Sequence, residues 1–366
     1  MEKFSEFITE AKEKPYKLVI FNHSGEMVRD VKDTGLGELV ALMTKSAKAI
    51  GIEIFQTDFV GAFVSEKNGK KYINSFPFDD EGVVIYPDQK GDKGYRRRPS
   101  SKGVGYQEPF EIDPDNTIIM PRGLGTIGLT SSRYWIDMIH RLENDGFLTL
   151  PSLKSWNICA SKYMTDILLR KAGLRTPKTV AIAHSEDTKR AMKELGTKFP
   201  VILKSSTGTQ TGVGVVIVES MRSLHAAVQM LMLYSKYLPI IIQEYIKTDY
   251  DVRVIILDGI VLGAMKRIVI QDSDFRSNVS LGADASIIEL TDIEIKDSLT
   301  AAKAVNGRLC GVDFIPAKNR EKEQPYIIEV NSMPGFGGIE KLDNKKSLTQ
   351  DIFKYFMNRD NWTLDN

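Results

Sequence analysis

Residues 311–338 decide the fold of this chain. They read Gly-Val-Asp-Phe-Ile-Pro-Ala, then a short charged loop, then Tyr-Ile-Ile-Glu-Val-Asn-Ser-Met-Pro-Gly-Phe-Gly-Gly. Each half is typical of a β-strand, and the two strands are expected to pair as a hairpin. Because alternate side chains of a strand share a face, one face of the second strand is predicted to be apolar. That face comprises Tyr326, Ile328 and Val330.

Oxygen donors are predicted to converge on the opposite face of this hairpin. Glu329 and Asn331 are neighbours there, and Asp313 lies among apolar residues of the first strand, from which its carboxylate can reach them. Neither strand carries a basic residue that would neutralise these groups. Hard oxygen donors in this arrangement suit a Mg²⁺ ion that also holds substrate phosphates. The alternative is two ordinary core strands whose acids face water.

The composition indicates a soluble globular protein with two or three domains. The chain has 366 residues, of which 42% are hydrophobic. Its 49 basic residues nearly cancel its 48 acidic ones, so no global field favours nucleic acid or an anionic membrane. Cys159 and Cys310 have no metal-type spacing, which fits a reducing compartment. The first residues are too charged for a signal peptide, and no apolar run approaches ~20 residues. We therefore expect a cytoplasmic protein.

The N-terminal region is predicted to begin an α/β domain. After an amphipathic arm at residues 1–14, residues 16–21 are predicted to form a strand, 37–50 a helix and 52–56 a second strand. Such a βαβ beginning places the first loop at the carboxyl edge of a parallel sheet, where these folds bind ligands. His23 lies in that loop and is a site candidate. The alternative is a loop histidine that serves only solubility.

A further strand and helix are predicted to complete this domain. Residues 117–120 have the pattern of a strand, a glycine-rich loop that carries Arg122 follows, and residues 132–145 have the pattern of a helix. Pro151 then marks the end of the domain.

A basic, glycine-rich loop interrupts the domain between Pro87 and Pro109. Its six cations are Lys90, Lys93, Arg96, Arg97, Arg98 and Lys102. One interpretation is a solvated insertion. Another is a basic lip that gathers an acidic substrate, since local charge concentrates anions near a cleft. Because Tyr95 and Tyr106 flank the arginines, contact with RNA is a third interpretation.

Residues 201–218 are predicted to form a β-hairpin flap that handles phosphate. A strand ending in Lys204 is followed by Ser-Ser-Thr-Gly-Thr-Gln-Thr-Gly-Val-Gly and a second strand. No Gly-Lys-Ser/Thr precedes a helix here, which excludes a Walker loop, and the same topology excludes a Rossmann turn. The glycines that let backbone N–H groups approach phosphate oxygens are Gly208, Gly212 and Gly214. A merely flexible hairpin is the alternative.

Other elements flank this hairpin. Ser161 is predicted to cap a helix whose apolar positions are Met164, Ile167, Leu168 and Ala172. Residues 239–246 are predicted to be a buried strand. Asp258-Gly259 predicts a hairpin turn, because Asp-Gly is among the strongest short-range hairpin signals. Two later helices are expected, at residues 298–305 and 348–356.

Together these motifs resemble the ATP-grasp ligases. Within them the chain is most similar to the RimK-type family of glutamate ligases, with prokaryotic glutathione synthetases as more distant relatives. The resemblance covers residues 115–341 well and residues 15–115 in outline. In chain order, the motifs that carry it are Lys162, Lys204 with Gly-Thr-Gln-Thr-Gly-Val-Gly, Gln243-Glu-Tyr-Ile246, Asp251-Val-Arg253, Asp274-Phe-Arg-Ser-Asn278, Gly311-Val-Asp313 and Glu329-Val-Asn331-Ser-Met-Pro-Gly.

The resemblance implies an α/β (α+β) chain with the ATP-grasp fold. An N-terminal βαβ pre-ATP-grasp domain would span residues 15–150 and carry the basic insertion at 87–109. Two α+β subdomains that clasp ATP would follow. The first, 151–245, would hold the glycine-rich flap, and the second, 246–366, the metal site.

The resemblance also implies roles for single residues. The ATP phosphates would be contacted by Lys162, Lys204 and the flap residues Gly208, Thr209, Gln210, Gly212 and Gly214. Glu244 and Tyr245 would form the connector that binds the adenine, and Asp251 would bind the ribose. The other cofactor-binding residues of this region would be Gln243, Ile246 and Arg253. The phosphates and the acyl group would meet Arg276, Ser277 and Asn278. Two Mg²⁺ or Mn²⁺ ions would be bound by Asp313, Glu329 and Asn331.

The reaction implied is carboxylate activation. The γ-phosphoryl group of ATP would pass to a carboxylate, and an amine would attack the resulting acyl phosphate. Arg276 and Asn278 are the catalytic candidates at the acyl group, and Arg267 is a further one; a structural salt bridge is the alternative for each arginine. The chain departs from the family pattern at three positions, Thr211, Lys266 and Ala283. Because Lys266 and Ala283 neighbour the expected acceptor cleft, substrate identity stays open.

Three functions are compatible with this sequence. The first is a ligase that adds glutamate or a similar amino acid to a protein or peptide. The second is a small-molecule ligase of the glutathione-synthetase kind, or one that crosslinks peptide side chains. The third is a catalytically silent ATP-binding regulator, against which the intact metal ligands argue. The partners expected are an amino acid and a protein, peptide or small-molecule acceptor, and no membrane or nucleic acid. If the basic loop gathers the substrate, the acceptor is acidic. A dimer or tetramer of the chain stays open.

Overall fold

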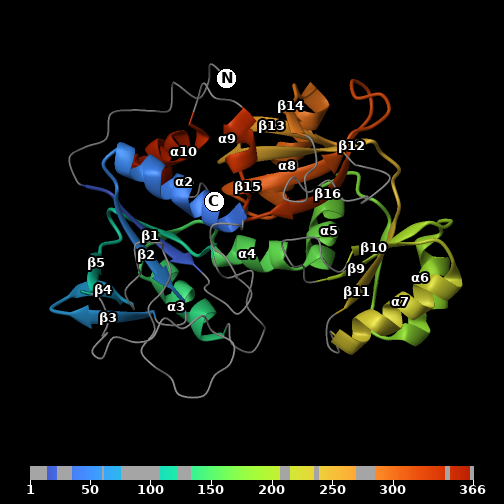
Figure 1. Ribbon diagram of the computed structural model, residues 1–366, viewed down its shortest axis with the longest axis horizontal. Helices are drawn as coiled ribbons and strands as arrows, with labels where there is room; N and C mark the ends of the chain where they lie inside the picture. Colours follow the sequence, from blue (N-terminus) through green and yellow to red (C-terminus); the bar gives the residue numbers. More distant parts are fainter. Residues whose placement is uncertain are drawn as a thin grey trace. The chain divides into compact units, whose positions relative to one another are not determined.

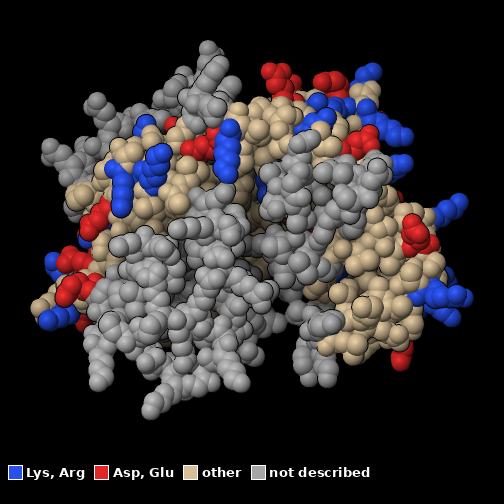
Figure 2. Space-filling model, in the orientation of Figure 1, with Lys and Arg blue, Asp and Glu red and all other residues tan. Residues whose placement is uncertain are grey.

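The computed structural model describes residues 15–22, 35–59, 62–75, 108–122, 133–206, 215–234, 239–268, 285–342 and 347–362. The chain divides into two compact units, Met1–Leu153 with Gly335–Asn366, and Lys154–Pro334 (Figure 1). Within the described ranges, no helix is long and apolar enough to cross a membrane. On the face shown in Figure 2, acidic and basic side chains of the described residues are interspersed, as expected when the charges nearly cancel.

A parallel sheet forms the centre of the first unit. Its strands are β1 (Lys17–Asn22), β2 (Glu53–Asp58), β6 (Thr117–Met120) and β7 (Leu148–Thr149), in the order β2-β1-β6-β7. Residues 18–21 are fully buried, as an apolar run in a parallel strand covered on both faces requires. The helix α2 (Gly35–Ala49) joins β1 to β2, and α3 (Arg133–Asn144) joins β6 to β7. The predicted βαβ beginning is therefore confirmed.

A second, antiparallel sheet in this unit was not predicted. It comprises β3 (Phe63–Lys67), β4 (Lys70–Asn74) and β5 (Phe110–Ile112). The charged, exposed side chains of β3 and β4 hide the alternation on which a strand prediction depends. The missed signal was Asn68-Gly69, where φ is 53° and 75°, as a tight hairpin turn requires. Residues 76–107 lie outside the described residues, so the roles suggested for the basic loop stay predictions.

The C-terminal helices group with the first unit. They are α9 (Gly337–Leu342) and α10 (Leu348–Phe356). The helix α10 packs against α2, and its side chains Ile352 and Phe356 are buried. We expected residues 246–366 to form one subdomain, and the structure differs because α10 buries its apolar face in the first unit. The boundary predicted between residues 245 and 246 falls within the second unit and stays a prediction.

The second unit contains the predicted flap in an antiparallel sheet. Its strands are β8 (Thr179–Ile182), β9 (Val201–Ser205), β10 (Val215–Val218) and β11 (Ile240–Glu244), in the order β10-β9-β11-β8. The antiparallel pairing of β9 with β10 confirms the hairpin, whose loop at residues 207–214 lies outside the described residues. The helices α6 (Thr188–Leu195) and α7 (Met221–Tyr234) contribute to the hydrophobic core on this sheet.

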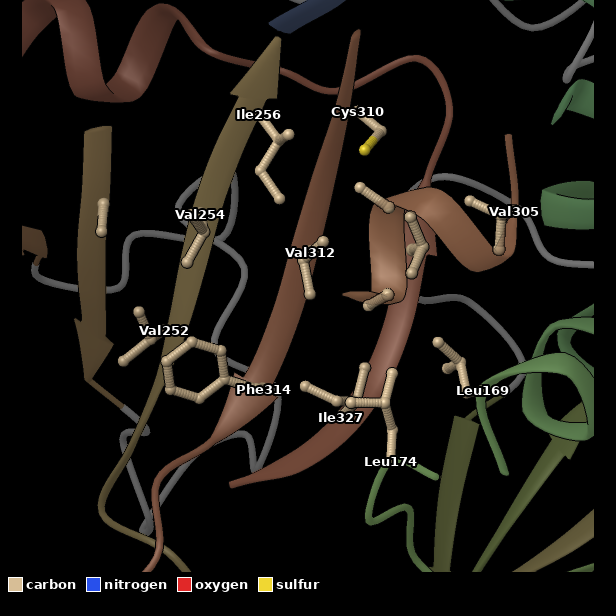
Figure 3. Packing of buried hydrophobic residues seen from close by; sticks show 14 residues of the cluster. Leu169, Leu174, Val252, Val254, Ile256, Val305, Cys310, Val312, Phe314 and Ile327 are labelled. Atoms are coloured by element: carbon tan, nitrogen blue, oxygen red, sulfur yellow. The ribbon is translucent and has the colours of Figure 1, made fainter. Parts of the chain in front are cut away.

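A larger antiparallel sheet completes the second unit. Its strands are β12 (Tyr250–Leu257), β13 (Ile260–Ile268), β14 (Ala285–Ile287), β15 (Leu309–Ile315) and β16 (Tyr326–Asn331), in the order β14-β13-β12-β15-β16. Figure 3 shows its apolar face, where Val252 and Val254 of β12 lie beside Val312 and Phe314 of β15. The Asp258-Gly259 turn between β12 and β13 has φ of 42° and 80°, so the predicted hairpin is confirmed.

A β-bulge changes the predicted face of β16. Glu329 lies opposite Asp313, but the next pair along the ladder uses Ile327, so Ile328 is an extra residue. Ile327 and Val330 are both buried in the core cluster, whereas the predicted alternation placed Ile328 there with Val330. That part of the prediction is wrong because one inserted residue reverses the alternation.

The helix α5 (Lys162–Lys171) begins as predicted but buries a different face. The Oγ of Ser161 accepts a hydrogen bond from the backbone N–H of Met164 at 3.2 Å, which confirms the cap. The buried residues are Thr165, Asp166 and Leu169, whereas Met164 is exposed. The predicted apolar face is wrong there because two of the three buried side chains are polar, and both are hydrogen-bonded.

We expected a helix to begin at residue 298, but the helix α8 (Asp292–Ala304) begins earlier, at Asp292. Its start is a capping box that the sequence analysis missed. The Oγ1 of Thr291 accepts from the backbone N–H of Glu294 at 3.3 Å, and the Glu294 carboxylate accepts from the backbone N–H of Thr291 at 3.0 Å.

Thr291→Ala is expected to lower the free energy of unfolding by about 1 kcal/mol, because it leaves a helix N–H group without its cap. Urea denaturation followed by circular dichroism measures the change. Thr300→Ala, within the same helix, serves as the control and should change stability by less than about 0.5 kcal/mol. Equal losses in both variants would show that the capping box adds nothing.

Candidate active site

The oxygen donors predicted from the sequence lie together in the second unit. Asp313 of β15 lies opposite Glu329 of β16, and Gly311 lies opposite Asn331. The Nδ2 of Asn331 donates to Glu329 Oε1 at 3.1 Å and lies 3.5 Å from Asp313 Oδ2. We call these three residues, Asp313, Glu329 and Asn331, the acidic trio. Two carboxylates and an amide form a hard-oxygen donor set that fits Mg²⁺.

The third metal ligand of the trio would be the side-chain amide of Asn331. Within the described ranges, no group of three or more His, Cys, Asp or Glu side chains is placed to hold a metal ion. An asparagine oxygen is a normal ligand of hard cations, so the amide completes a set that a search of acids alone does not find. The metal-binding role of the trio stays a prediction.

Two arginines neutralise Asp313 from neighbouring strands. Arg253 of β12 donates to Asp313 through Nε at 2.7 Å and through Nη2 at 2.5 Å. Arg267 of β13 lies with Nη2 3.1 Å from Asp313 Oδ2 and also donates to both oxygens of Asp251, at 2.7 and 2.8 Å. We call these four residues, Asp251, Arg253, Arg267 and Asp313, the ion network. The sequence of β15 and β16 alone could not show it.

The ion network keeps Asp313 and Arg267 charged. Burial alone would raise the pKa of Asp313, but the charges of Arg253 and Arg267 outweigh it and lower that pKa. Burial would likewise lower the pKa of Arg267, but Asp313 and Asp251 raise it above its usual value. Arg267 is 3% exposed, and it forms the salt bridge that was the alternative to its predicted catalytic role. Asp251, predicted on the ribose, has both carboxylate oxygens on Arg267.

Lys204 is buried, and its charge interacts with that of Glu329 in the acidic trio. Its Nζ donates to Gln243 Oε1 at 2.9 Å, and Gln243 Nε2 donates to Thr179 Oγ1 at 2.8 Å. Burial lowers the pKa of Lys204 to about 8; the charge of Glu329 opposes this lowering and that of Lys162 adds to it. The sheet that carries the flap therefore supplies a buried cation that interacts electrostatically with a carboxylate of the trio.

The first residue of α5 is fixed at the end of β9. The backbone N–H of Lys162 donates to the carbonyl of Ser206 at 2.9 Å. This places both predicted phosphate-binding lysines, Lys162 and Lys204, at one end of the flap hairpin. On β11, the backbone N–H of Glu244 donates to the carbonyl of Lys178 at 2.9 Å, and the Glu244 carboxylate accepts from the Lys178 N–H at 3.2 Å. Tyr245 and Ile246 follow and are half-buried.

The remaining predicted site residues lie outside the described residues. They are His23 of the first loop, Gly208, Thr209, Gln210, Gly212 and Gly214 of the flap, and Arg276, Ser277 and Asn278. Lys266, a departure from the family pattern, has its Nζ 4.2 Å from the centre of the Tyr250 ring. It thus makes a cation–π contact on the sheet.

One residue near the trio was not singled out as a site residue. Cys159 belongs to α4 (Leu153–Ala160) and interacts with Ser332, which directly follows the trio. Burial raises the pKa of Cys159 to about 12, although the neighbouring Ser155 and Ser332 oppose the shift. The thiol therefore stays protonated at neutral pH and is no nucleophile.

Comparison with known proteins places this geometry in context. Residues 159–355 match the model of the RimK-like ATP-grasp domain. A probable alpha-L-glutamate ligase of Marinomonas sp. (strain MWYL1) is 32% identical over 234 residues, which are 63% of this chain and 73% of that protein.

Two solved structures are similar over nearly their full length. One is the ATP-grasp ligase PsnB complexed with a phosphomimetic variant of a minimal precursor, Mg and ADP, with a TM-score of 0.58 and 17% identity over 95% of this chain and 99% of that one. The other is a Chryseobacterium gregarium RiPP-associated ATP-grasp ligase in complex with ADP and a leader and core peptide. Its TM-score is 0.61 at 14% identity, over 92% of this chain and 95% of that one.

Arg267→Met is expected to lower the free energy of unfolding by about 3–5 kcal/mol, because it leaves the buried carboxylates of the ion network undercompensated. Urea denaturation in the presence of a chelator measures the loss. Arg190→Met, which removes an exposed ion pair with Asp187, is the control and should cost less than about 1 kcal/mol. If both variants unfold at the same urea concentration, the ion network does not support the sheet.

Proposed function

Because the chain belongs to the RimK-like ATP-grasp family, we propose that it is an ATP-dependent ligase that adds glutamate or a similar amino acid to a protein or peptide. The fold is that of the ATP-grasp ligases, as the resemblance implied. The observation that carries the proposal is the acidic trio, held on adjacent strands, with the buried Lys204 in electrostatic interaction with Glu329. Convergent oxygen donors next to a cation are what a nucleotide's phosphates and their metal ion require.

The reaction proposed has two steps. The γ-phosphoryl group of ATP passes to a substrate carboxylate, which gives ADP and an acyl phosphate. An amine then attacks the carbonyl carbon, loses a proton, and the tetrahedral intermediate releases phosphate and leaves an amide. No residue of the chain forms a covalent bond in either step. Catalysis therefore depends on holding the reactants and compensating their charge.

The described residues divide this work among them. Lys204 and Lys162 hold the negative phosphates, and Gln243 fixes the position of the Lys204 ammonium through its amide oxygen. The trio would hold Mg²⁺, or Mn²⁺ in its place, as two ions in our prediction. The metal, when bound, supplies positive charge to the phosphates. Arg253 and Arg267 orient Asp313 toward the rest of the trio.

We place the reaction in the cytoplasm, since Cys159 and Cys310 are free thiols that fit a reducing compartment. The acceptor is a peptide or protein in this proposal, and its acidity and the oligomeric state of the chain stay predictions. The test is incubation of cell lysate proteins and peptides with the enzyme, ATP, Mg²⁺ and labelled amino acids. Mass spectrometry should find labelled residues added to macromolecules. Label confined to small molecules contradicts the proposal, and unlabelled peptides that lose water indicate a crosslinking ligase.

Glu329→Gln should retain the fold and lower the rate of ADP formation by at least about 100-fold, because it removes one negative charge from the metal-binding set. Steady-state ADP release measures the effect. Glu321→Gln, an exposed acid in the loop between β15 and β16, is the matched control and should keep the wild-type rate. A near-normal rate for Glu329→Gln would remove the trio from the metal site.

Lys204 should give ATP binding a dependence on pH. Its pKa of about 8 lies below the ordinary 10.5, so the free protein loses this cation as the pH rises above about 8. ATP affinity is therefore expected to fall between about pH 8 and about pH 10, while Lys204→Arg keeps its charge and its affinity over that range. Without ATP, the unfolded chain binds more protons at Lys204 over this range, so this residue should make stability rise with pH.

Calorimetric titration of ATP at a series of pH values tests this dependence. The exposed Lys198→Arg is the control, and its affinity should fall with pH as that of the wild type does. If the wild type and Lys204→Arg show the same pH profile, Lys204 does not bind the phosphates.

A further inference from the structure

Arg122 lies just beyond the end of β6, at the carboxyl edge of the parallel sheet of the first unit. In the order β2-β1-β6-β7, the chain passes from β1 through α2 to β2 on one side, and from β6 through α3 to β7 on the other. The direction of winding therefore changes between β1 and β6. Open α/β sheets bind ligands outside the carboxyl ends of their strands at such a switch point.

Arg122 is buried, and none of the described residues supplies it with a counter-ion. It is 3% exposed, and its Nε has no hydrogen-bond partner in the part of the chain that the structure describes. Burial is the one cause that lowers the pKa of its guanidinium, to about 10. The side chain therefore stays positively charged at neutral pH, and no described acid compensates the charge.

Other buried arginines of the chain are treated differently. Arg267 donates two hydrogen bonds to Asp251, and Arg308 donates to Asp258 at 2.9 Å. Such pairing is what a buried charge ordinarily requires, because removal from water is costly unless an opposite charge is close. The fold thus supplies carboxylates to its structural arginines, and Arg122 departs from that pattern at the edge where ligands bind.

We propose that Arg122 anchors a carboxylate-binding site at this switch point, and that the ligand is the carboxylate of an amino acid or peptide substrate. A guanidinium presents two parallel N–H groups that match the two oxygens of a carboxylate. One carboxylate also balances one buried positive charge, whereas a phosphate dianion would leave an uncompensated negative charge. The choice of glutamate as the probe rests on the proposed function; the site itself rests on the burial and position of Arg122.

The experiment compares the wild type with Arg122→Met and Arg122→Lys. Calorimetric titration with L-glutamate should show binding to the wild type that weakens at least ~10-fold in Arg122→Met, the effect of losing a charge-assisted pair. Arg122→Lys keeps the charge but lacks the two parallel N–H groups of the guanidinium, so its glutamate affinity should lie between those of the wild type and Arg122→Met. Arg133→Met, in which an exposed arginine of the same unit is replaced, should bind glutamate like the wild type.

Thermal denaturation separates a binding role from a structural one. Without ligand, Arg122→Met should melt at or above the wild-type temperature, because it removes an unpaired buried charge at similar length. Glutamate should then raise the melting temperature of the wild type and leave that of Arg122→Met unchanged. Should Arg122→Met fail to fold, Arg122→Lys decides the question by its glutamate affinity.

Four results would overturn the site. The first two are no binding of glutamate to the wild type, and equal glutamate affinity in the wild type and Arg122→Met. The third is wild-type glutamate affinity in Arg122→Lys, if Arg122→Met does not fold. The fourth is Arg122-dependent binding of inorganic phosphate in place of glutamate.

ADP formation distinguishes failure of the site from failure of the proposed function. If glutamate binds through Arg122 but does not stimulate ADP release, the proposed carboxylate site stands and the proposed ligase function fails. If glutamate stimulates ADP release and Arg122→Met leaves the glutamate KM unchanged, the ligase function stands and the proposed site fails.

Discussion

The second unit depends on the compensation of one buried charge, that of Asp313. This carboxylate is 4% exposed in the middle of a sheet, where an unpaired charge would be strongly destabilising. Arg253 and Arg267 reach it from β12 and β13, and Asp251 in turn balances Arg267. Two cations and two anions therefore cross three strands, and the strand order β13-β12-β15 is the one that brings them together. The position of Asp313, and with it that of Glu329 and Asn331, is fixed by this network.

The sequence predicted the trio but could not predict what surrounds it. The trio follows from local pattern, because Glu329 and Asn331 are two residues apart and the hairpin is short in sequence. The pairing of β12 with β15 joins residues far apart in the chain, and no single-sequence pattern specifies it. The ion network depends on that pairing. Ile328 illustrates a second limit, since a bulge inserts one residue and reverses an alternation that is otherwise regular.

In the first unit, the longer apolar strands were predictable, whereas the exposed strands and the buried two-residue strand β7 were not. The apolar runs of β1 and β6 predicted strands, and the strand–helix–strand order that begins at β1 predicted the parallel sheet. The strands β3 and β4 carry charged side chains, and only Asn68-Gly69 marked their turn. Membership of α10 in this unit also escaped prediction. Its residues 348–356 were predicted to be helical, but the apolar face of a helix does not say against which unit it packs.

The buried cations in the described part of the chain fall into two groups, those paired with a carboxylate inside the fold and those that are not. Arg267 and Arg308, like the half-buried Arg253, each have a carboxylate partner, so their charges are compensated within the fold. Lys204 hydrogen-bonds to a neutral amide and has a depressed pKa, and Arg122 has no described counter-ion. A folded chain that buries positive charge without compensation gives up stability at that place. The reaction proposed here brings anions as reactants, phosphates and carboxylates, and these can provide the missing charge. The positive charges of Lys204 and Arg122 are incompletely compensated in the unliganded protein, and a binding site for an anion requires such a charge.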